Sequence, residues 1–437
     1  MREEEKIGIM DNVMIIGKGK KYMKQKKQVY SVDYIKPLDG VRALANLIVA
    51  WFHIWQQSWL QPIKETKCLS IFNVTQINLD WLVRTGYQMV DVMLLLSGFC
   101  LFLPYAKSMV YGAAEPHLKQ FYKKRVARIM PSYYFAILVA LVVALAAGKY
   151  SSSSAMWKDL VPHLFFVHTY SEQSYLATNL NVVLWTLAVE VQFYIIFPFL
   201  AKLFKRCAWG TYCGMVAVSW MFDNWVITPR LASINLGMWF NQLPTFLCVY
   251  ANGMMAALIV VKFSQILNTY LENAEEVQIK NTKRIVGYFF TMLMLLSLYV
   301  YYIMMKNLTV AENGSVWQYN NRYMFSLVFT VFIVGCTFAL SFVQKIFGNR
   351  VMKFLSGISF QIYIWHQFLA TLFKEHHIPY WTGENPPNML GDKVWMWKYF
   401  ILCWAGAIVV ATAVTYLIER PCSKIIMKQF DKSRKRG

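Results

Sequence analysis

The chain has 437 residues, of which 57% are hydrophobic and only 15% are charged, and it carries a formal net charge of +21. A soluble domain of this length would be closer to half apolar and more highly charged, which argues against a water-soluble protein. The excess of apolar residues forms long segments, and these predict an all-α polytopic membrane protein.

The two ends of the chain are basic and polar. We predict a cytoplasmic basic tail over 1–37, a transmembrane domain over 38–420 and a second cytoplasmic basic tail over 421–437. The charged start, Met1-Arg2-Glu3-Glu4-Glu5-Lys6, is unlike a cleavable signal peptide. We therefore expect the first span to act as its own insertion signal.

About ten transmembrane helices are predicted between these tails. The predicted spans are 40–59, 86–105, 129–148, 183–201, 207–226, 237–261, 285–305, 322–343, 354–373 and 399–418. The apolar segment 161–170 is too short to cross a bilayer, and we expect it to be interfacial or re-entrant.

The distribution of Lys and Arg predicts the orientation. With the N-terminus inside, these residues are about three times as frequent in the inner segments as in the outer ones. This bias predicts that both termini are cytoplasmic. It also accounts for the high net positive charge of the chain without nucleic-acid binding.

The first span carries two ionisable residues on one face. Arg42 and His53 are 11 residues apart, which is about three helical turns or roughly 16 Å of helix. Ionisable groups inside the bilayer are costly and indicate function. His53 could act as a base for a hydroxyl that attacks an acyl carbonyl. The alternative is a structural hydrogen bond to a neighbouring helix.

Three further polar residues are predicted at the depth of His53, in the outer half of the membrane: Asp91, Glu190 and His366. Glu190 could take part in catalysis or be a structural partner of an Arg or His. Asp91 lies near the end of its span, where it could simply be solvated. The aromatic residues around His366 are typical of an interfacial belt, but the histidine is not.

Two arginines are predicted on one helix face at the cytoplasmic side. Arg125 and Arg128 have i,i+3 spacing, and Arg side chains match phosphate groups in geometry. They could bind the phosphates of a nucleotide-bearing donor or simply anchor the helix to lipid. Ser97-Gly98 could line the same site or serve close helix packing.

No metal site is predicted. The eight cysteines are dispersed without metal-ligand spacing, and we expect no disulfide framework. Cys68 lies in a predicted outer loop that offers it no obvious partner.

In order along the chain, these motifs resemble the acyltransferase-3 family of bacterial membrane O-acyltransferases. The resemblance covers roughly 33–421, and its motifs are strong only as an ordered set. They are Leu38-Asp39-Gly40-Val41-Arg42 leading to His53, Val90-Asp91-Val92 through Leu96-Ser97-Gly98-Phe99, Arg125-Val126-Ala127-Arg128, Trp185 to Tyr194, Ile362-Tyr363-Ile364-Trp365-His366 and Glu419-Arg420-Pro421.

The resemblance implies transfer of an acyl group, commonly acetyl, from cytosolic acyl-CoA to a sugar hydroxyl outside. It makes Arg42 and His53 essential and assigns Arg125 and Arg128 to the donor. Many relatives carry a C-terminal extracytoplasmic esterase-like domain, and this chain stops about twenty residues after its last predicted span. We therefore expect the membrane domain to act alone or with a separate extracytoplasmic transferase.

The sequence thus predicts a multi-pass enzyme of the plasma or inner membrane, with a cell-envelope glycan or glycolipid as acceptor. We expect His53, Arg42, Glu190 and His366 to be catalytic, with His53 as base or transient acyl carrier. The donor would be bound by Arg125, Arg128, Ser97 and Gly98, and no metal is expected. The alternative is an exporter of a lipid-linked or polar substrate, in which the same charges form a proton relay.

Overall fold

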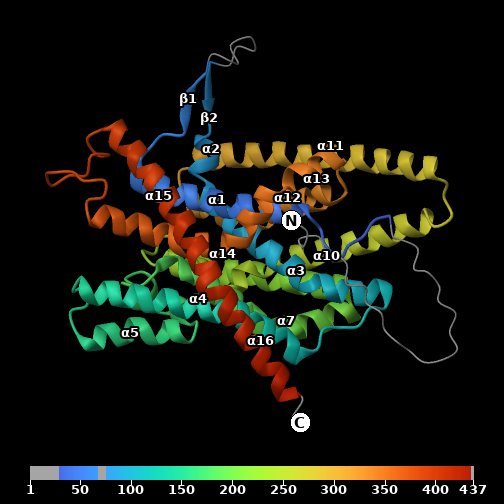
Figure 1. The fold of residues 1–437 in the computed structure, drawn as a ribbon, viewed down its shortest axis with the longest axis horizontal. Helices are drawn as coiled ribbons and strands as arrows, with labels where there is room; N and C mark the ends of the chain where they lie inside the picture. The colour runs from blue at the N-terminus through green and yellow to red at the C-terminus, as the bar shows by residue number, and fades with distance from the viewer. Residues whose placement is uncertain (1–28, 67–74, 435–437) are drawn as a thin grey trace, which may run out of the picture.

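The computed structural model describes residues 29–66 and 75–434. Most of its long helices lie side by side with similar directions, and the C-terminal helix crosses the front of the bundle obliquely (Figure 1). Cys68 and most of the basic N-terminal tail lie outside the described residues.

The described chain is almost entirely helical. The long helices are α1 (Pro37–Ser58), α3 (Met89–Tyr111), α4 (Leu118–Ala146), α7 (Trp185–Arg206), α8 (Ala208–Phe222), α10 (Leu243–Tyr270), α11 (Glu276–Thr309), α12 (Gly314–Phe338), α14 (Arg350–Glu375), α15 (Lys393–Val414) and α16 (Arg420–Arg434). The short helices are α2 (Asp80–Val83), α5 (Ser153–Leu164), α6 (Glu172–Tyr175), α9 (Leu236–Phe240) and α13 (Ser341–Phe347). An antiparallel hairpin consists of β1 (Ile63–Glu65) and β2 (Gln76–Asn78).

Among the described residues, seven helical segments are long and apolar enough to cross a membrane. They contain α3, α4, α7, α10, α11, α12 and α15, so the prediction of an all-α polytopic membrane protein is confirmed. The other three predicted spans correspond to α1, α8 and α14, which are more polar or shorter. The count of ten and the orientation in the membrane stay predictions.

Several helices extend beyond the predicted spans. Helix α4 begins at Leu118, so the two arginines lie on the same continuous helix as the apolar segment that follows them. The predicted span 322–343 is interrupted after Phe338, where α12 ends and the short α13 begins. The segment 161–170 contains the end of α5 and a short 3-10 turn, His168–Tyr170, and does not cross the bundle.

The centre of the bundle is the contact between α3 and α10, which pack along most of their length. Two glycines permit this close approach. A Cβ added at Gly98 would lie 2.7 Å from the carbonyl oxygen of Tyr250, and one added at Gly253 would lie 2.1 Å from that of Leu95. Small residues at a membrane helix interface allow backbones to approach closely, so Gly98 is a packing residue.

Helix α1 packs along both α14 and α3. Pro37 begins the helix, at a position where its missing N–H costs nothing. The helix ends where Trp59 adopts a left-handed conformation with φ of 57°.

The segment before α1 is tied to the C-terminal part of α3. Lys107 Nζ donates to Asp33 Oδ1 at 2.7 Å, and this hydrogen bond lowers the pKa of Asp33. The hydroxyl of Tyr34 donates to Asp39, which raises the pKa of Tyr34 to about 12. Both contacts fix the start of α1, from which Arg42 projects.

A cap at the opposite end of the bundle consists of α5, α6 and the loop that leads into α7. Asp159 accepts hydrogen bonds from Tyr150 Oη at 2.8 Å, Thr178 Oγ1 at 2.8 Å and the Asn179 amide at 2.9 Å. The Asn181 side chain then donates to the Ile364 carbonyl of α14 at 2.7 Å. This network holds the loop over the site.

Candidate active site

The two predicted histidines are neighbours. The rings of His53 on α1 and His366 on α14 have their centroids 5.1 Å apart and are inclined by 40°. The pairing follows from the packing of α1 on α14, which brings together residues that are 313 positions apart in the sequence.

The hydrogen bonds of His366 favour one tautomer of its neutral ring. His366 Nδ1 lies 3.0 Å from the carbonyl oxygen of Ile362, and His53 Nδ1 lies 3.1 Å from Gln56 Oε1. Because a backbone carbonyl only accepts hydrogen bonds, a neutral His366 carries its hydrogen on Nδ1 and keeps a lone pair on Nε2. Among the described residues, Nε2 of the buried His366 has no hydrogen-bond partner, so it is available to accept a proton.

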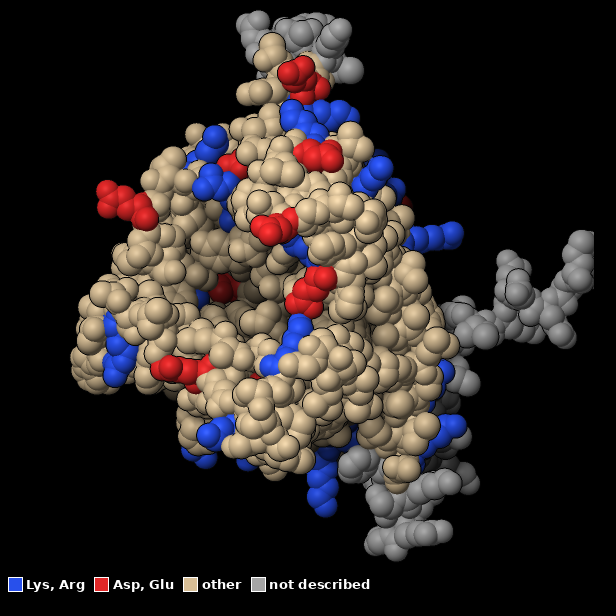
Figure 2. All heavy atoms as spheres, turned by 90° about the vertical axis from the view of Figure 1, so that its left-hand side faces the viewer, with Lys and Arg blue, Asp and Glu red and all other residues tan. Residues whose placement is uncertain are grey.

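His53 lines a cavity of about 390 Å³, which we call the outer chamber. Figure 2 shows a deep hollow in the corresponding face of the molecule, with an acidic and a basic side chain at its floor. The chamber walls combine aromatic rings with amide and charged groups, including Phe52, Trp185, Asn241, Gln318 and Gln367. Such a lining is suited to a ligand with both hydroxyl groups and apolar faces.

An ion pair that the sequence did not predict lies in the wall of the outer chamber. Arg322 Nε on α12 donates to Asp91 Oδ2 on α3 at 3.2 Å, and these side chains are only 3% and 2% exposed. The guanidinium lies 4.5 Å from the ring centre of Phe240 and 4.3 Å from that of Phe246. Its Nη2 has no hydrogen-bond partner among the described residues.

This pair corrects the interpretation of Asp91 and adds a residue to which no role was assigned. Asp91 is not solvated at the interface, because α10 and α12 cover the N-terminal end of α3. Arg322 is the first residue of the predicted span 322–343, and its side chain is buried. The signal that could have identified it is an arginine directly before a long apolar run.

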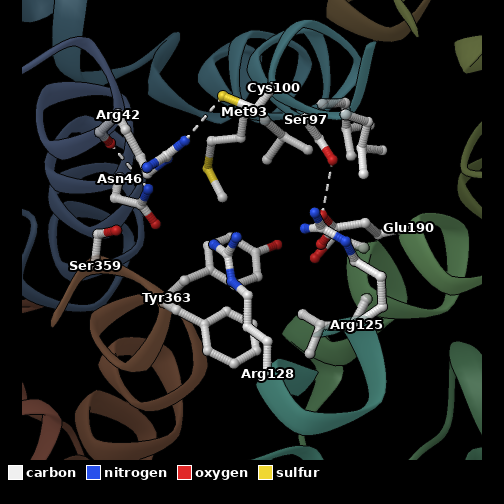
Figure 3. Close-up of a pocket in the computed structure, with 16 residues that line it drawn as sticks. Arg42, Asn46, Met93, Ser97, Cys100, Arg125, Arg128, Glu190, Ser359 and Tyr363 are labelled. Atoms are coloured by element: carbon white, nitrogen blue, oxygen red, sulfur yellow. Dashed lines mark hydrogen bonds between the residues drawn. The ribbon is translucent and has the colours of Figure 1, made fainter. Parts of the chain in front are cut away.

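The second cavity, the arginine pocket, lies at the other end of the site. It is about 80 Å³ in volume, and its lining includes Arg42, Arg125, Arg128, Glu190 and Ser97. Figure 3 shows three guanidinium groups that project into it from two sides, Arg42 from α1 and the other two from α4. Three positive groups around one small cavity favour a ligand with phosphate or another anionic group.

Glu190 lies in the arginine pocket and not beside the histidines. Its Oε1 accepts hydrogen bonds from Ser97 Oγ at 2.8 Å and from Tyr194 Oη. Glu190 therefore lines a different cavity from His53, which lies in the outer chamber. Both hydrogen bonds compensate the partial burial of the carboxylate.

Arg42 is held at the edge of the arginine pocket. Its Nη2 lies 3.3 Å from Cys100 Sγ, and its carbonyl oxygen accepts a hydrogen bond from Asn46 Nδ2 at 3.0 Å. Ser97 lines this pocket, whereas Gly98 faces α10, so of the two small residues only Ser97 is placed to meet a ligand.

Tyr363 and Val90 separate the two cavities, because each lines both the arginine pocket and the outer chamber. The Tyr363 ring centre is 5.8 Å from that of His366. The sequence contained Tyr363 within a motif but gave it no role. Its position makes it part of the wall between the cationic and the histidine-containing ends of the site.

Long apolar helices that enclose arginine and histidine side chains define a polytopic membrane protein with a polar site inside its bundle. The comparison with known protein families identifies the class of membrane protein. The profile described as an acyltransferase domain matches residues 35–420, and the chain belongs to this acyltransferase-3 family. The protein is therefore an acyltransferase that transfers groups other than aminoacyl groups, and the exporter alternative is not supported.

The individual relatives are distant. A protein named as an acetyltransferase, ORF330 of Acidianus two-tailed virus, is 24% identical over 357 residues, which are 80% of this chain and 88% of that protein. O-acetyltransferase OatA of Staphylococcus aureus is 23% identical over 384 residues, 84% of this chain but only 55% of OatA. The chain thus spans about half the length of the staphylococcal relative. No solved structure matches it.

Proposed function

We propose that this protein is a multi-pass O-acetyltransferase of the plasma or inner membrane. It would move an acetyl group from cytosolic acetyl-CoA to a hydroxyl of a glycan or glycolipid of the cell envelope. The observation that carries the proposal is the position of α1, which contributes Arg42 to the arginine pocket and His53 to the outer chamber. The relatives named as acetyltransferases support the acetyl group.

The donor would bind with its phosphates at the arginine pocket. Arg125 and Arg128 form charge-assisted hydrogen bonds with phosphate, and Arg125 also lies 5.6 Å from the ring centre of Tyr194. The side chain of Glu190, bonded to Ser97, balances part of the positive charge and orients the neighbouring groups. The pantetheine arm would then extend past Arg42 and Tyr363 toward the histidines.

The acceptor would bind in the outer chamber. In our proposal, Nε2 of His53 takes the proton from the acceptor hydroxyl while the hydroxyl oxygen attacks the carbonyl carbon of the thioester. The new C–O bond forms, the C–S bond breaks, and the leaving thiolate receives the proton from the imidazolium. If His53 itself attacks, a transient acyl-imidazole precedes the same final ester. His366, packed against His53, would orient that ring and support its charge.

The test uses sealed vesicles of known orientation that contain the purified protein. Radiolabelled acetyl-CoA is supplied on one side and membrane extract containing the acceptor on the other. Transfer is expected only with the donor on the cytoplasmic face and the acceptor opposite. Equal transfer with both substrates on the cytoplasmic face would contradict transmembrane delivery, and transfer only after a soluble extracytoplasmic fraction is added would show that a separate transferase completes the reaction.

A further inference from the structure

A further cavity lies between the end of α8 and the first part of α12, against α10. This cavity, which we call the side cavity, has a volume of about 360 Å³, within the range of ~300–1,000 Å³ that is typical of small-molecule sites. Two of its lining residues, Trp220 and Asn320, are exposed, so the cavity reaches the surface of the protein. Its lining includes Trp220, Asp223, Asn224, Tyr319, Asn320 and Arg322.

Hydrogen bonds between helices fix the walls of the side cavity. Ser219 Oγ on α8 donates to the Pro244 carbonyl at 2.7 Å and accepts from the Cys248 amide of α10 at 2.9 Å. The hydroxyl of Tyr323 on α12 lies 2.8 Å from that of Tyr212 on α8. Ser219, Cys248 and Tyr323 all line the cavity. Its shape is therefore set by defined contacts among three helices.

Two charged side chains of opposite sign in this wall have hydrogen-bonding atoms left over. Oδ1 of Asp223 and Nη2 of Arg322 are buried and have no hydrogen-bond partner among the described residues. The Arg322 side chain is only 3% exposed, and its Nε and Nη1 already donate to Asp91 and to the Phe240 carbonyl. These contacts hold the guanidinium in place. Because unpaired buried polar atoms are costly, the pattern favours a ligand that donates to the carboxylate and accepts from the guanidinium.

A neutral hydroxyl group meets both requirements. Its hydrogen can be donated to Asp223 while its oxygen accepts from Arg322. An anion would be repelled by the carboxylate and a cation by the guanidinium, so the cavity favours an uncharged ligand. The rings of Trp220 and Tyr319 offer apolar surface to the C–H faces of a sugar, and two asparagine side chains in the lining offer further polar contacts.

We propose that the side cavity is a second saccharide-binding site, which binds a neutral sugar. Among the described residues, it shares no lining residue with the arginine pocket and only Arg322 with the outer chamber. The inference goes beyond acetyl transfer, because binding here needs neither the donor nor the histidines. Since Arg322 lines both cavities, a saccharide in the side cavity would lie one arginine side chain away from the chamber of the acceptor.

Two substitutions remove different parts of the side cavity without changing Arg322. Asp223→Ala removes the carboxylate, and Trp220→Ala removes a ring. The matched control for the ring is Trp225→Ala, because Trp225 is 66% exposed, lies close to Trp220 in the chain and does not line the cavity. The control for the charge is Glu312→Ala, an exposed carboxylate shortly before α12. The midpoint of thermal unfolding identifies the variants that are folded.

The assay is a ligand-observed NMR titration of the full-length protein in nanodiscs, without donor, since maltoside detergents would themselves supply sugar. The probes are maltotriose and the trisaccharide of N-acetylglucosamine, both neutral, and the acidic trigalacturonate. We expect the wild type and the two controls to bind a neutral trisaccharide with the same affinity. Asp223→Ala and Trp220→Ala should each bind it at least tenfold more weakly, because each loses a direct contact with the sugar. Trigalacturonate should bind the wild type more weakly than the neutral probes.

The outcomes decide this inference separately from the proposed function. No binding of either neutral trisaccharide by the wild type would overturn the inference, and so would tighter binding of trigalacturonate. Unchanged binding by both folded cavity variants would place the sugar elsewhere and overturn it as well. The acetyltransferase proposal would stand in each case, because its test requires the donor. If Asp223→Ala is unfolded, Trp220→Ala decides the result.

Discussion

The histidine pair gives the most direct test of the chemistry. In His53→Ala the acceptor hydroxyl loses its proton acceptor, and loss of a general base typically costs 10²–10⁴-fold in rate, or roughly 3–5 kcal/mol of barrier. With the ring centres 5.1 Å apart, the two imidazoles can contact one substrate hydroxyl but cannot serve separate reactions. We therefore expect them to act as a unit.

The double variant His53→Ala/His366→Ala provides the quantitative check. If the two rings act in one step, the double variant should be no more than about threefold slower than His53→Ala, because effects within a catalytic unit do not add. The rate is measured as initial transfer of radiolabelled acetyl from acetyl-CoA, with CoA affinity as the folding control. His376→Ala is the matched control, since that histidine is exposed in the following loop. More than half of wild-type turnover in His53→Ala would refute this reasoning.

Three further predictions follow from the surroundings of the site. Arg125→Gln with Arg128→Gln should weaken CoA affinity at least tenfold, as measured by titration in detergent, and unchanged affinity would leave both residues as topology signals. Asp91→Asn and Arg322→Gln should each destabilise by about 3 kcal/mol, whereas the double variant should cost less than the sum of the two in thermal unfolding; additive losses would show that the buried pair is not coupled. In the cap, burial lowers the pKa of His168 to about 2, so the folded protein keeps this ring neutral while the unfolded chain protonates it below about pH 6.5. Stability should therefore fall as the pH drops from 7 to 5, by up to about 1.4 kcal/mol per pH unit, and less so in His168→Gln; equal losses in both proteins would contradict this origin.

The sequence predicted those parts of the site that lie within one helix. The helical period placed Arg42 and His53 on one face of α1, and the i,i+3 spacing placed Arg125 and Arg128 together, because both depend only on local geometry. The all-α membrane fold followed from apolar segment lengths for the same reason.

The contacts between distant helices could not be predicted in this way. Asp91 and Arg322 are 231 residues apart, and only the packing of α12 on α3 brings them together. Glu190 and His53 were predicted at a similar depth, but they line different cavities because they lie on different helices, α7 and α1. The position of a residue along its span predicts only its depth in the membrane. Whether two side chains meet also depends on how each helix is rotated about its own axis.

Helix α1 fixes the spacing between the two ends of the site. A single helix separates Arg42 from His53 by about 16 Å along its axis. If the donor binds as we propose, this distance sets the length that its carrier arm must span. A donor whose phosphate and reactive carbonyl are closer together, such as a simple acyl phosphate, cannot reach both ends at once. A longer acyl chain meets no such limit, because it extends beyond the histidines into the roomier outer chamber. The enzyme would thus select its donor by the length of the carrier arm more strongly than by the size of the acyl group.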